Sequence, residues 1–298
     1  MTGNFLDDII KSGGITMNLT QLTAGNVLDL LPKRKADSHK GDYGRILLLC
    51  GSKGYTGAAA LAAMGALRAG AGLVYLGVPE TIYQIEAVKL TEPIVFPLPE
   101  QDGMLSKEAI EKIKTMLSTM DAVLIGPGLG QSEGTLAVTT YILNHFSGPV
   151  VVDADGINVL CEHKNILRDR TSPTILTPHP GEYCRLAGIT VDNRICCAVN
   201  LAKDLDSVVV LKGHETVITD GNDVIINTTG NPGMAVGGSG DVLAGIIVAL
   251  LGQGLTTLHA AACGAWIHGA AGDVCAKEIG QYGMLPSDML QVLPRLLK

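Results

Sequence analysis

The segment 231–241 (NPGMAVGGSGD) combines the features of a phosphate-binding loop with a carboxylate that could act as a base. Its glycines at 237, 238 and 240 leave the backbone free to turn its amides inward. The apolar residues 242–251 predict a helix whose first amides have no partner within the helix. Free amides and the positive end of a helix dipole suit a polyphosphate, so we predict an anion hole formed by Gly238, Ser239 and Gly240.

Asp241 needs a further reason to lie beside a phosphate, because its carboxylate would repel a bound anion. One reason is chemistry: a neighbouring anion raises the pKa of the carboxyl group, which could then take a proton from a substrate hydroxyl. The alternative is that Asp241 only caps the helix while the glycines form a loop. The segment alone fits both interpretations.

Composition limits the classes of partner. The chain has 298 residues and a net charge of −7, which argues against nucleic acid or an anionic membrane as a main partner. No Pro/Ser/Gly-rich linker divides it, and no apolar run reaches the ~18 residues that a membrane span needs. The start lacks the pattern of a signal peptide, and the seven cysteines form no CxxC pair. We therefore expect a cytoplasmic protein with a large buried core.

Short apolar runs alternate with glycine turns and helical stretches. The first unit is a strand over 45–50, where the sheet is expected to begin, a turn over 51–57 and an alanine-rich helix over 58–69. Further strands are predicted over 73–78, 122–125, 150–152, 174–176 and 208–211, with a hairpin on the sheet edge formed by 216–219 and 224–227. From Asp241 onward we expect mostly helix, with the last helices over 259–277 and 287–297. This order predicts an α/β fold with a mostly parallel sheet and helices on both faces.

Polar and glycine-rich turns follow five of the predicted strands. They are GSKGYTGA (51–58), GPGLG (126–130), DADGIN (153–158), TPHPGE (177–182) and KGHET (212–216). Ligands of open α/β sheets bind beyond the carboxyl ends of the strands. We therefore expect these five turns to outline a single crevice.

Two of these turns suggest ligand contacts. GPGLG could be a dinucleotide fingerprint, but it has no clear acidic residue ~20 positions on, so close approach of backbone to a ligand is the better use of its glycines. His179 lies between two prolines, which fix its backbone and reduce the entropy lost on contact with a ligand. A turn histidine bonded to backbone is the alternative.

The remaining polar candidates carry charge. Asp153 and Asp155 resemble a metal-binding pair, although Asp155 could equally start a helix. We therefore predict no metal ligand from the protein, while Mg²⁺ held by phosphates and water remains compatible with the sequence. Lys212 could neutralise a phosphate or extend to solvent at a strand end.

The motifs become specific when they are read in order. The series is SHKGDYG (38–44), GAA (57–59), GPGLG (126–130), DADGIN (153–158), LTPHPGE (176–182), VLKGHET (210–216) and NPGMAVGGSGD (231–241). It resembles the ADP/ATP-dependent NAD(P)H-hydrate dehydratase family, which has the ribokinase-like fold. The resemblance implies a single domain over 19–298, and residues 1–18 are expected to be a disordered N-terminal extension.

The resemblance also implies a reaction and its residues. Hydrated NADH or NADPH would lose its added water in a hydro-lyase reaction that consumes ADP or ATP with Mg²⁺ and releases phosphate. The nucleotide would contact Lys212, Gly213, His214, Glu215, Thr216 and Gly240. The hydrated dinucleotide would contact Ala58, Gly128, His179 and Asp241. Asp241 would deprotonate the ring hydroxyl as it attacks the terminal phosphoryl group, and the phosphorylated hydrate would then eliminate. These residues fit either nucleotide, and the compact, unfused chain favours ADP.

Further expectations concern partners. Many bacterial relatives carry an N-terminal epimerase domain for the two hydrate epimers, so a separate epimerase is expected here, and the family resemblance implies a homo-oligomer, a tetramer. Two other functions fit the same segment. A ribokinase-like kinase for a vitamin precursor or sugar would release a stable phosphorylated product. A catalytically silent nucleotide-binding or scaffold protein would have little use for an acid beside a phosphate.

Overall fold

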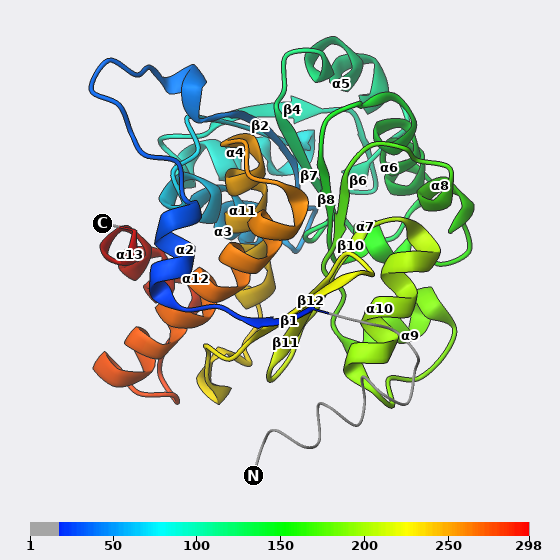
Figure 1. Ribbon diagram of the computed structural model, residues 1–298. Coiled ribbons are helices and arrows are strands. Elements are labelled where there is room, and N and C mark those ends of the chain that lie inside the picture. Colours follow the sequence, from blue (N-terminus) through cyan, green and yellow to red (C-terminus); the bar gives the residue numbers. More distant parts are fainter. Residues whose placement is uncertain (1–17, 298) are drawn as a thin grey trace.

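Ten strands form one sheet in the computed structural model, which describes residues 18–297 (Figure 1). The order across the sheet is β1-β12-β11-β10-β9-β8-β7-β2-β3-β4. The strands are β1 (Asn18–Gln21), β2 (Arg45–Leu49), β3 (Leu73–Pro79), β4 (Ile94–Leu98), β7 (Ala122–Ile125), β8 (Val150–Val152), β9 (Thr174–Leu176), β10 (Val208–Leu211), β11 (Thr216–Thr219) and β12 (Asp223–Asn227). Only β11 runs antiparallel to its neighbours. A separate two-stranded hairpin joins β5 (Glu100–Gln101) to β6 (Met104–Leu105).

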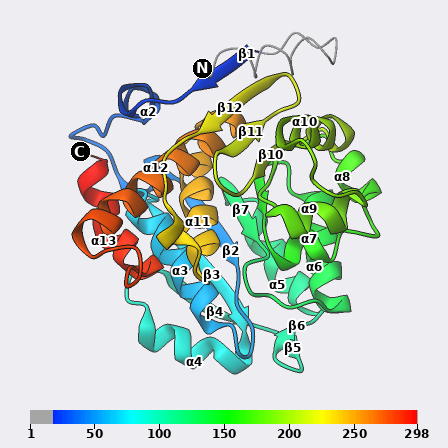
Figure 2. The same ribbon diagram turned by 90° about the horizontal axis from the view of Figure 1, so that it is seen from below.

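Helices cover both faces of this sheet (Figure 2). The α-helices are α2 (Ala24–Leu30), α3 (Thr56–Arg68), α4 (Glu80–Lys89), α5 (Ala109–Leu117), α6 (Glu133–His145), α7 (Asp155–Asn158), α8 (Asn165–Arg168), α9 (Pro180–Ala187), α10 (Arg194–Leu205), α11 (Ser239–Gly252), α12 (Thr257–Glu278) and α13 (Pro286–Leu296). Two 3₁₀ turns, η1 (Lys40–Tyr43) and η2 (Pro232–Met234), complete the set. Among the described residues, no helix is long and apolar enough to cross a lipid bilayer.

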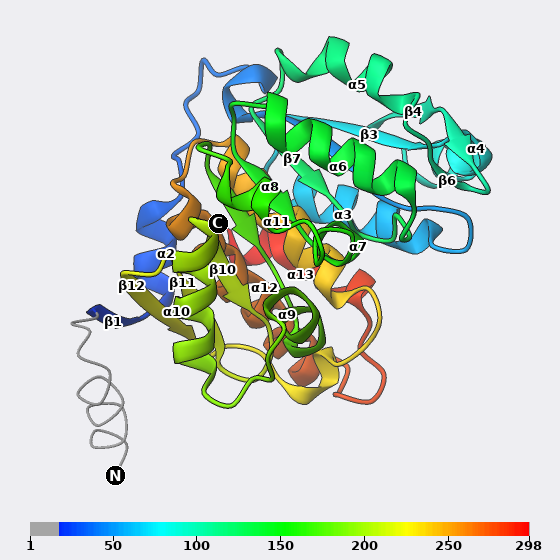
Figure 3. The same ribbon diagram turned by 90° about the vertical axis from the view of Figure 1, so that its right-hand side faces the viewer.

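The alternation of side chains along β2 divides the interior into two cores. Ile46 and Leu48 pack with α3, α11, α12 and α13, whereas Leu47 and Leu49 pack with α5, α6, α9 and α10. All four side chains are fully buried, as expected when helices cover both faces of a parallel sheet. Figure 3, which faces the second helix layer, shows α6, α8 and α10 in front of the strands. The predicted fold class is confirmed.

Helices α3 and α11 approach one another unusually closely. A side chain on Gly65 would reach within 2.8 Å of the Val242 carbonyl oxygen, and one on Gly245 would collide with the Ala62 carbonyl. Only glycine allows this separation, because any Cβ would push the two backbones apart. Leu61 lies next to Gly238 and Gly65 next to Val242, so the two helices run in the same direction.

Two predictions about the sheet were wrong. The sheet does not begin near Arg45, because β1 pairs in parallel with β12 from Asn18 onward. For the same reason the β11–β12 hairpin is not the edge of the sheet. The extension predicted over 1–18 lies outside the described residues, except that Asn18 begins β1. The other predicted strands and helices occur within about two or three residues of their predicted bounds.

Candidate functional site

The five strands that precede the polar turns are immediate neighbours, in the order β10-β9-β8-β7-β2. The turns are also joined by hydrogen bonds between backbones. The Lys212 amide donates to the Pro178 carbonyl at 2.9 Å, and the Gly51 amide donates to the Pro127 carbonyl at 2.7 Å. The expectation that these turns lie together at one edge of the sheet is confirmed.

Helix α11 begins at this edge with the glycine-rich segment. Its N-cap, Gly238, has a φ of +97°, and a side chain there would collide with Leu61. Glycine is therefore required to start the helix at this place. Ser239, Gly240 and Asp241 form the first turn, where amides lack partners within the helix. Of the residues predicted to form the anion hole, Ser239 differs from Gly238 and Gly240, because its amide donates back to the Val236 carbonyl at 3.3 Å.

Lys212 connects this turn to the strand ends. Its ammonium lies 2.8 Å from Asp153 Oδ1 and 3.7 Å from Glu182 Oε2. Thr177 Oγ1 donates to the same Asp153 oxygen at 2.6 Å. A Cβ atom placed on Gly240 would lie 3.5 Å from Lys212 Nζ, so the cation faces the start of α11. Residues that directly follow β8, β9 and β10 thus meet the first turn of α11 around one charge.

Burial and neighbouring carboxylates set the protonation of this cluster. Burial, followed by the charge of Asp153, raises the pKa of Asp241 to about 6, although Lys212 acts in the opposite direction. Burial alone would lower the pKa of Lys212, but Asp153 and Glu182 outweigh it and the pKa is raised. At neutral pH the site therefore holds an ionised Asp241 with a weakly acidic pKa beside a fully charged Lys212.

His179 caps helix α9 while keeping one nitrogen for other contacts. Its Nδ1 accepts from the amides of Gly181 at 2.9 Å and Glu182 at 3.3 Å. The ring proton of a neutral His179 therefore lies on Nε2. That nitrogen is 3.5 Å from Glu182 Oε1, and the side chain is 50% exposed. The bond to backbone that the sequence left as an alternative is present, and Nε2, beside Glu182 Oε1, is the ring nitrogen from which His179 can donate to a ligand.

Ala58 and Gly128 form a second wall of the site. Gly128 has a φ of +63°, and a Cβ there would lie 2.7 Å from the Cβ of Ala58. Ser52 holds this arrangement, since its hydroxyl donates to the Gly128 carbonyl at 2.8 Å. Tyr55, which sequence reasoning missed, starts α3 beside Gly128 with 63% of its surface exposed.

The nucleotide candidates after Lys212 lie in the turn between β10 and β11. Gly213, His214 and Glu215 are exposed, and Thr216 donates from its hydroxyl to the Gly213 carbonyl at 2.8 Å. Arg194, a second residue that sequence reasoning missed, supports this turn from α10. Its guanidinium donates to the Leu211 carbonyl at 2.7 Å and occupies the space where a Gly213 side chain would project. The local sequence around Arg194 gives no signal of this contact.

Asp153 and Asp155 already have hydrogen-bonding partners within the protein. Asp153 binds Lys212 and Thr177, while Asp155 starts α7 and accepts from the Gly130 amide at 2.9 Å. Among residues 18–297 no group of three or more His, Cys, Asp or Glu side chains is arranged to hold a metal ion.

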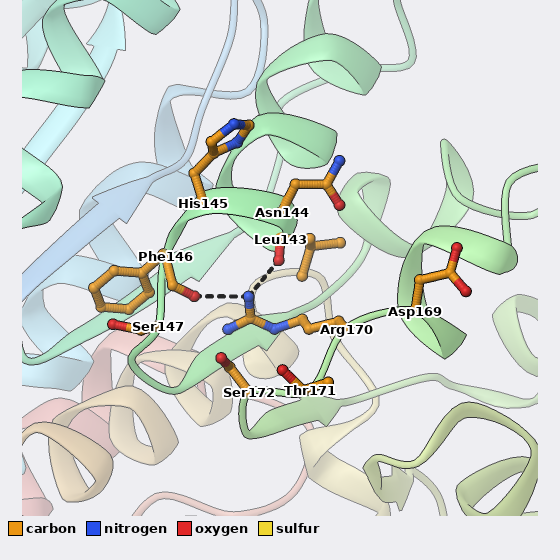
Figure 4. Close-up of a pocket in the computed structure, with 9 residues that line it drawn as sticks. All are labelled: Leu143, Asn144, His145, Phe146, Ser147, Asp169, Arg170, Thr171 and Ser172. Atoms are coloured by element: carbon orange, nitrogen blue, oxygen red, sulfur yellow. Dashed lines mark hydrogen bonds between the residues drawn. The ribbon is translucent and has the colours of Figure 1, made fainter.

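A cavity of about 280 Å³ lies on another part of the molecule, at the amino ends of β8 and β9 (Figure 4). Arg170 is its central side chain, and four of its five N–H donors are already used by the protein. They bind the carbonyls of Leu143, Phe146 and Gly148 and the hydroxyl of Thr174. Because ligands of such sheets bind at the carboxyl ends, we interpret Arg170 as a structural tie between α6 and β9.

A family profile described as NAD(P)H-hydrate dehydratase matches residues 46–295. The chain belongs to this family. The ADP-dependent (S)-NAD(P)H-hydrate dehydratase of Bacillus subtilis is 36% identical over 95% of this chain and 99% of its own length. The bifunctional NAD(P)H-hydrate repair enzyme of Moorella thermoacetica is 46% identical over 94% of this chain. The chain spans about half the length of such bifunctional relatives, 54% in that case.

Two solved structures have the same fold. The ADP/ATP-dependent dehydratase of Bacillus subtilis, co-crystallised with ATP and Mg²⁺, superimposes with a TM-score of 0.79 and 34% identity, covering 94% of this chain and 98% of the other. A ribokinase-like superfamily protein of Enterococcus faecalis gives a TM-score of 0.83 at 28% identity, covering 94% and 95%. The ribokinase-like fold implied by the sequence is confirmed.

Proposed function

We propose that this protein dehydrates the hydrated forms of NADH and NADPH at the expense of ADP or ATP. It is a hydro-lyase that repairs a damaged cofactor. The observation that carries the proposal is the position of Asp241, which lies in the first turn of α11 with a pKa of about 6, beside Lys212 and the Gly240 backbone. A site that only bound a nucleotide would gain nothing from this carboxylate.

The reaction has two steps, and the chain supplies groups for both. Asp241 takes the proton of the ring hydroxyl as that oxygen attacks the terminal phosphorus of the nucleotide, whose bond to AMP or ADP breaks. Amides of Gly238 and Gly240, with Lys212, stabilise the charge on the transferred phosphoryl oxygens. Phosphate then leaves with the electrons of the ring C–O bond, a proton leaves the neighbouring ring carbon, and the dihydronicotinamide is restored.

The two substrates are placed on opposite walls of the crevice. The nucleotide lies along Lys212, Gly213, His214, Glu215 and Thr216 with its phosphates at Gly240. The hydrate lies between Ala58, Gly128 and His179. A Mg²⁺ ion would enter with the nucleotide and would offset the charge of its phosphates. Because Asp153 is committed to Lys212, the phosphates and water supply most of the ligands of this ion.

The partners follow from the stereochemistry of the substrate. The relative from Bacillus subtilis is named for the (S) hydrate. An enzyme with that preference needs an epimerase, supplied by a separate protein or a domain outside residues 19–298, to use the other epimer. We also propose a homo-oligomer, a tetramer by family resemblance, and a cytoplasmic location, which agrees with seven free cysteines.

The direct test is the purified protein with NADH hydrate and either ADP or ATP with Mg²⁺, followed by the absorbance of the restored dihydronicotinamide. We expect inorganic phosphate and NADH in equal amounts. Accumulation of a phosphorylated organic product would instead indicate a small-molecule kinase. Nucleotide binding without turnover would indicate a silent binding protein. A parallel assay with NADPH hydrate measures the preference between the two substrates.

A further inference from the structure

One face of helix α12 lies against the segment that leads into the anion hole. Asp273 accepts from the Gly230 amide at 2.9 Å and from the Asn231 side chain at 3.0 Å. Thr229 Oγ1 donates to the Trp266 carbonyl at 3.0 Å. A side chain on Gly269 would collide with Thr229. The path of the chain before α11 is therefore fixed by α12.

His268 extends this support to the anion hole itself. Its Nε2 lies 3.3 Å from Ser239 Oγ, within hydrogen-bonding distance, and either atom can be the donor. Both residues are only 8% exposed, so the contact lies behind the turn and away from solvent. The Ser239 side chain points inward to His268, and this fixes how the neighbouring amides of α11 can face the crevice.

We propose that His268 is a positioning residue for phosphoryl transfer, which holds the first turn of α11 through Ser239 so that its amides meet the transferred phosphate. The inference rests on the proposed function, but it concerns a residue that touches neither substrate. It acts through Ser239, because an anion hole stabilises developing charge only when its donors are held in place before the reaction.

The ionisation of His268 agrees with this role. Burial lowers the pKa of His268 to about 4, and the charge of Lys212 acts in the same direction to a smaller extent. A hydrogen bond with the Ser239 backbone opposes this shift but does not outweigh burial. The imidazole is therefore neutral at physiological pH. It serves as a hydrogen-bonding group of fixed position, leaving Lys212 as the cation nearest the phosphates.

Two substitutions of similar polarity separate positioning from simple stability. In His268→Gln the terminal amide reaches the position of Nε2 and can keep the bond to Ser239. In His268→Asn the amide reaches only the position of Nδ1 and loses that bond. We expect His268→Asn to lower kcat by about 10- to 100-fold, the size of effect that misplacement of a reacting group produces. His268→Gln should keep most of the activity. The two variants should have similar melting temperatures, so that the difference in kcat reports positioning and not stability. Cys263→Ala, a buried truncation on the same helix, controls for general loosening of α12.

A double-mutant cycle tests the link through Ser239. If His268 acts only through this hydroxyl, Ser239→Ala and His268→Asn should each lower kcat, and the double variant should be no worse than the poorer single variant. Equal kcat in the Gln and Asn variants, a loss of activity that only follows the melting temperature, or independent effects in the cycle would each overturn the proposal.

Calorimetric titration with ADP or ATP and Mg²⁺ distinguishes this inference from the proposed function. We expect His268→Asn to weaken nucleotide binding several-fold relative to His268→Gln. If the wild-type protein binds nucleotide but turns over no hydrate, the function is wrong, and the affinity ratio of the two variants still decides the role of His268. No nucleotide binding by the wild-type protein overturns both.

Discussion

Lys212 Nζ and Asp153 Oδ1 lie 2.8 Å apart although their strands, β10 and β8, are separated by β9. The Asp153 side chain is 2% exposed and that of Lys212 18% exposed. Thr177, which follows β9, fills the gap by donating to the same carboxylate oxygen. A nucleotide phosphate that approaches Gly240 must therefore share Lys212 with Asp153.

Removal of one partner of this pair should destabilise the fold. Lys212→Met leaves a buried carboxylate with Thr177 as its remaining side-chain partner, and we expect the free energy of unfolding to fall by about 3 kcal/mol. The double variant Lys212→Met/Asp153→Asn removes both charges and should recover part of this loss. Urea denaturation at pH 7 measures the two single variants, Lys212→Met and Asp153→Asn, and the double variant. Additive losses in the double variant would show that the two residues are not energetically coupled.

Asp241→Asn should abolish turnover without loss of nucleotide binding. Loss of a general base typically lowers the rate ~10²- to 10⁴-fold. Nucleotide affinity should stay the same or increase, because an anion beside the phosphates is removed. Turnover is measured with NADH hydrate and affinity by calorimetry. A variant that keeps most of the wild-type rate would remove Asp241 as the base.

The raised pKa of Asp241 also predicts two dependences on pH. The folded protein holds this proton up to about pH 6, whereas the unfolded chain loses it near the usual value of 3.8. The wild-type protein should therefore lose stability relative to Asp241→Asn as the pH rises from about 4 to 6, by roughly 1–3 kcal/mol. Over the same upper range kcat/KM should rise as the base ionises. Parallel stability curves for the two proteins from pH 4 to 7 would contradict the shift.

Gly240 and Gly237 offer a matched pair of substitutions in the glycine-rich segment. A side chain on Gly240 would project toward Lys212 Nζ, whereas one on Gly237 would meet no atom within 4 Å. We expect Gly240→Val to abolish detectable nucleotide binding while the protein remains folded, and Gly237→Val to bind nearly normally. Calorimetry and circular dichroism measure both. Unchanged affinity in folded Gly240→Val would place the anion hole elsewhere.

His179 can be tested without loss of its cap. Asn is among the preferred N-cap residues, so His179→Asn should keep α9 intact while it removes the Nε2 donor. His179→Ala loses both. Loss of a ligand hydrogen bond costs roughly 0.5–1.5 kcal/mol, so both variants should raise the KM for the hydrate several-fold with little change in the KM for the nucleotide. Only His179→Ala should also lower the melting temperature. An effect confined to the nucleotide would place His179 on the wrong wall.

The sequence predicted the central strands and their polar turns because fully buried parallel strands are continuous apolar runs, such as RILLL in β2. It missed β4, where Pro97 interrupts the pattern, and β1, a short strand whose four residues, NLTQ, are mostly polar. His268 and Arg194 were missed for a different reason. Their contacts join residues 29 and 17 positions apart, and no local pattern marks a side chain whose partner is fixed only by tertiary packing.

The glycine contacts between α3 and α11 bear on how the reacting atoms find one another. Ala58 lies on α3 and Gly240 on α11, so each helix carries one wall of the crevice. Because Gly65 and Gly245 place backbone against backbone, the two helices cannot slide or rotate without a clash. In the proposed reaction, the distance between the substrate hydroxyl and the phosphorus would then be set by the fold, and closure on binding would be left to the surrounding loops. Changes in substrate preference should accordingly arise in those loops, while the separation of α3 and α11 stays the same.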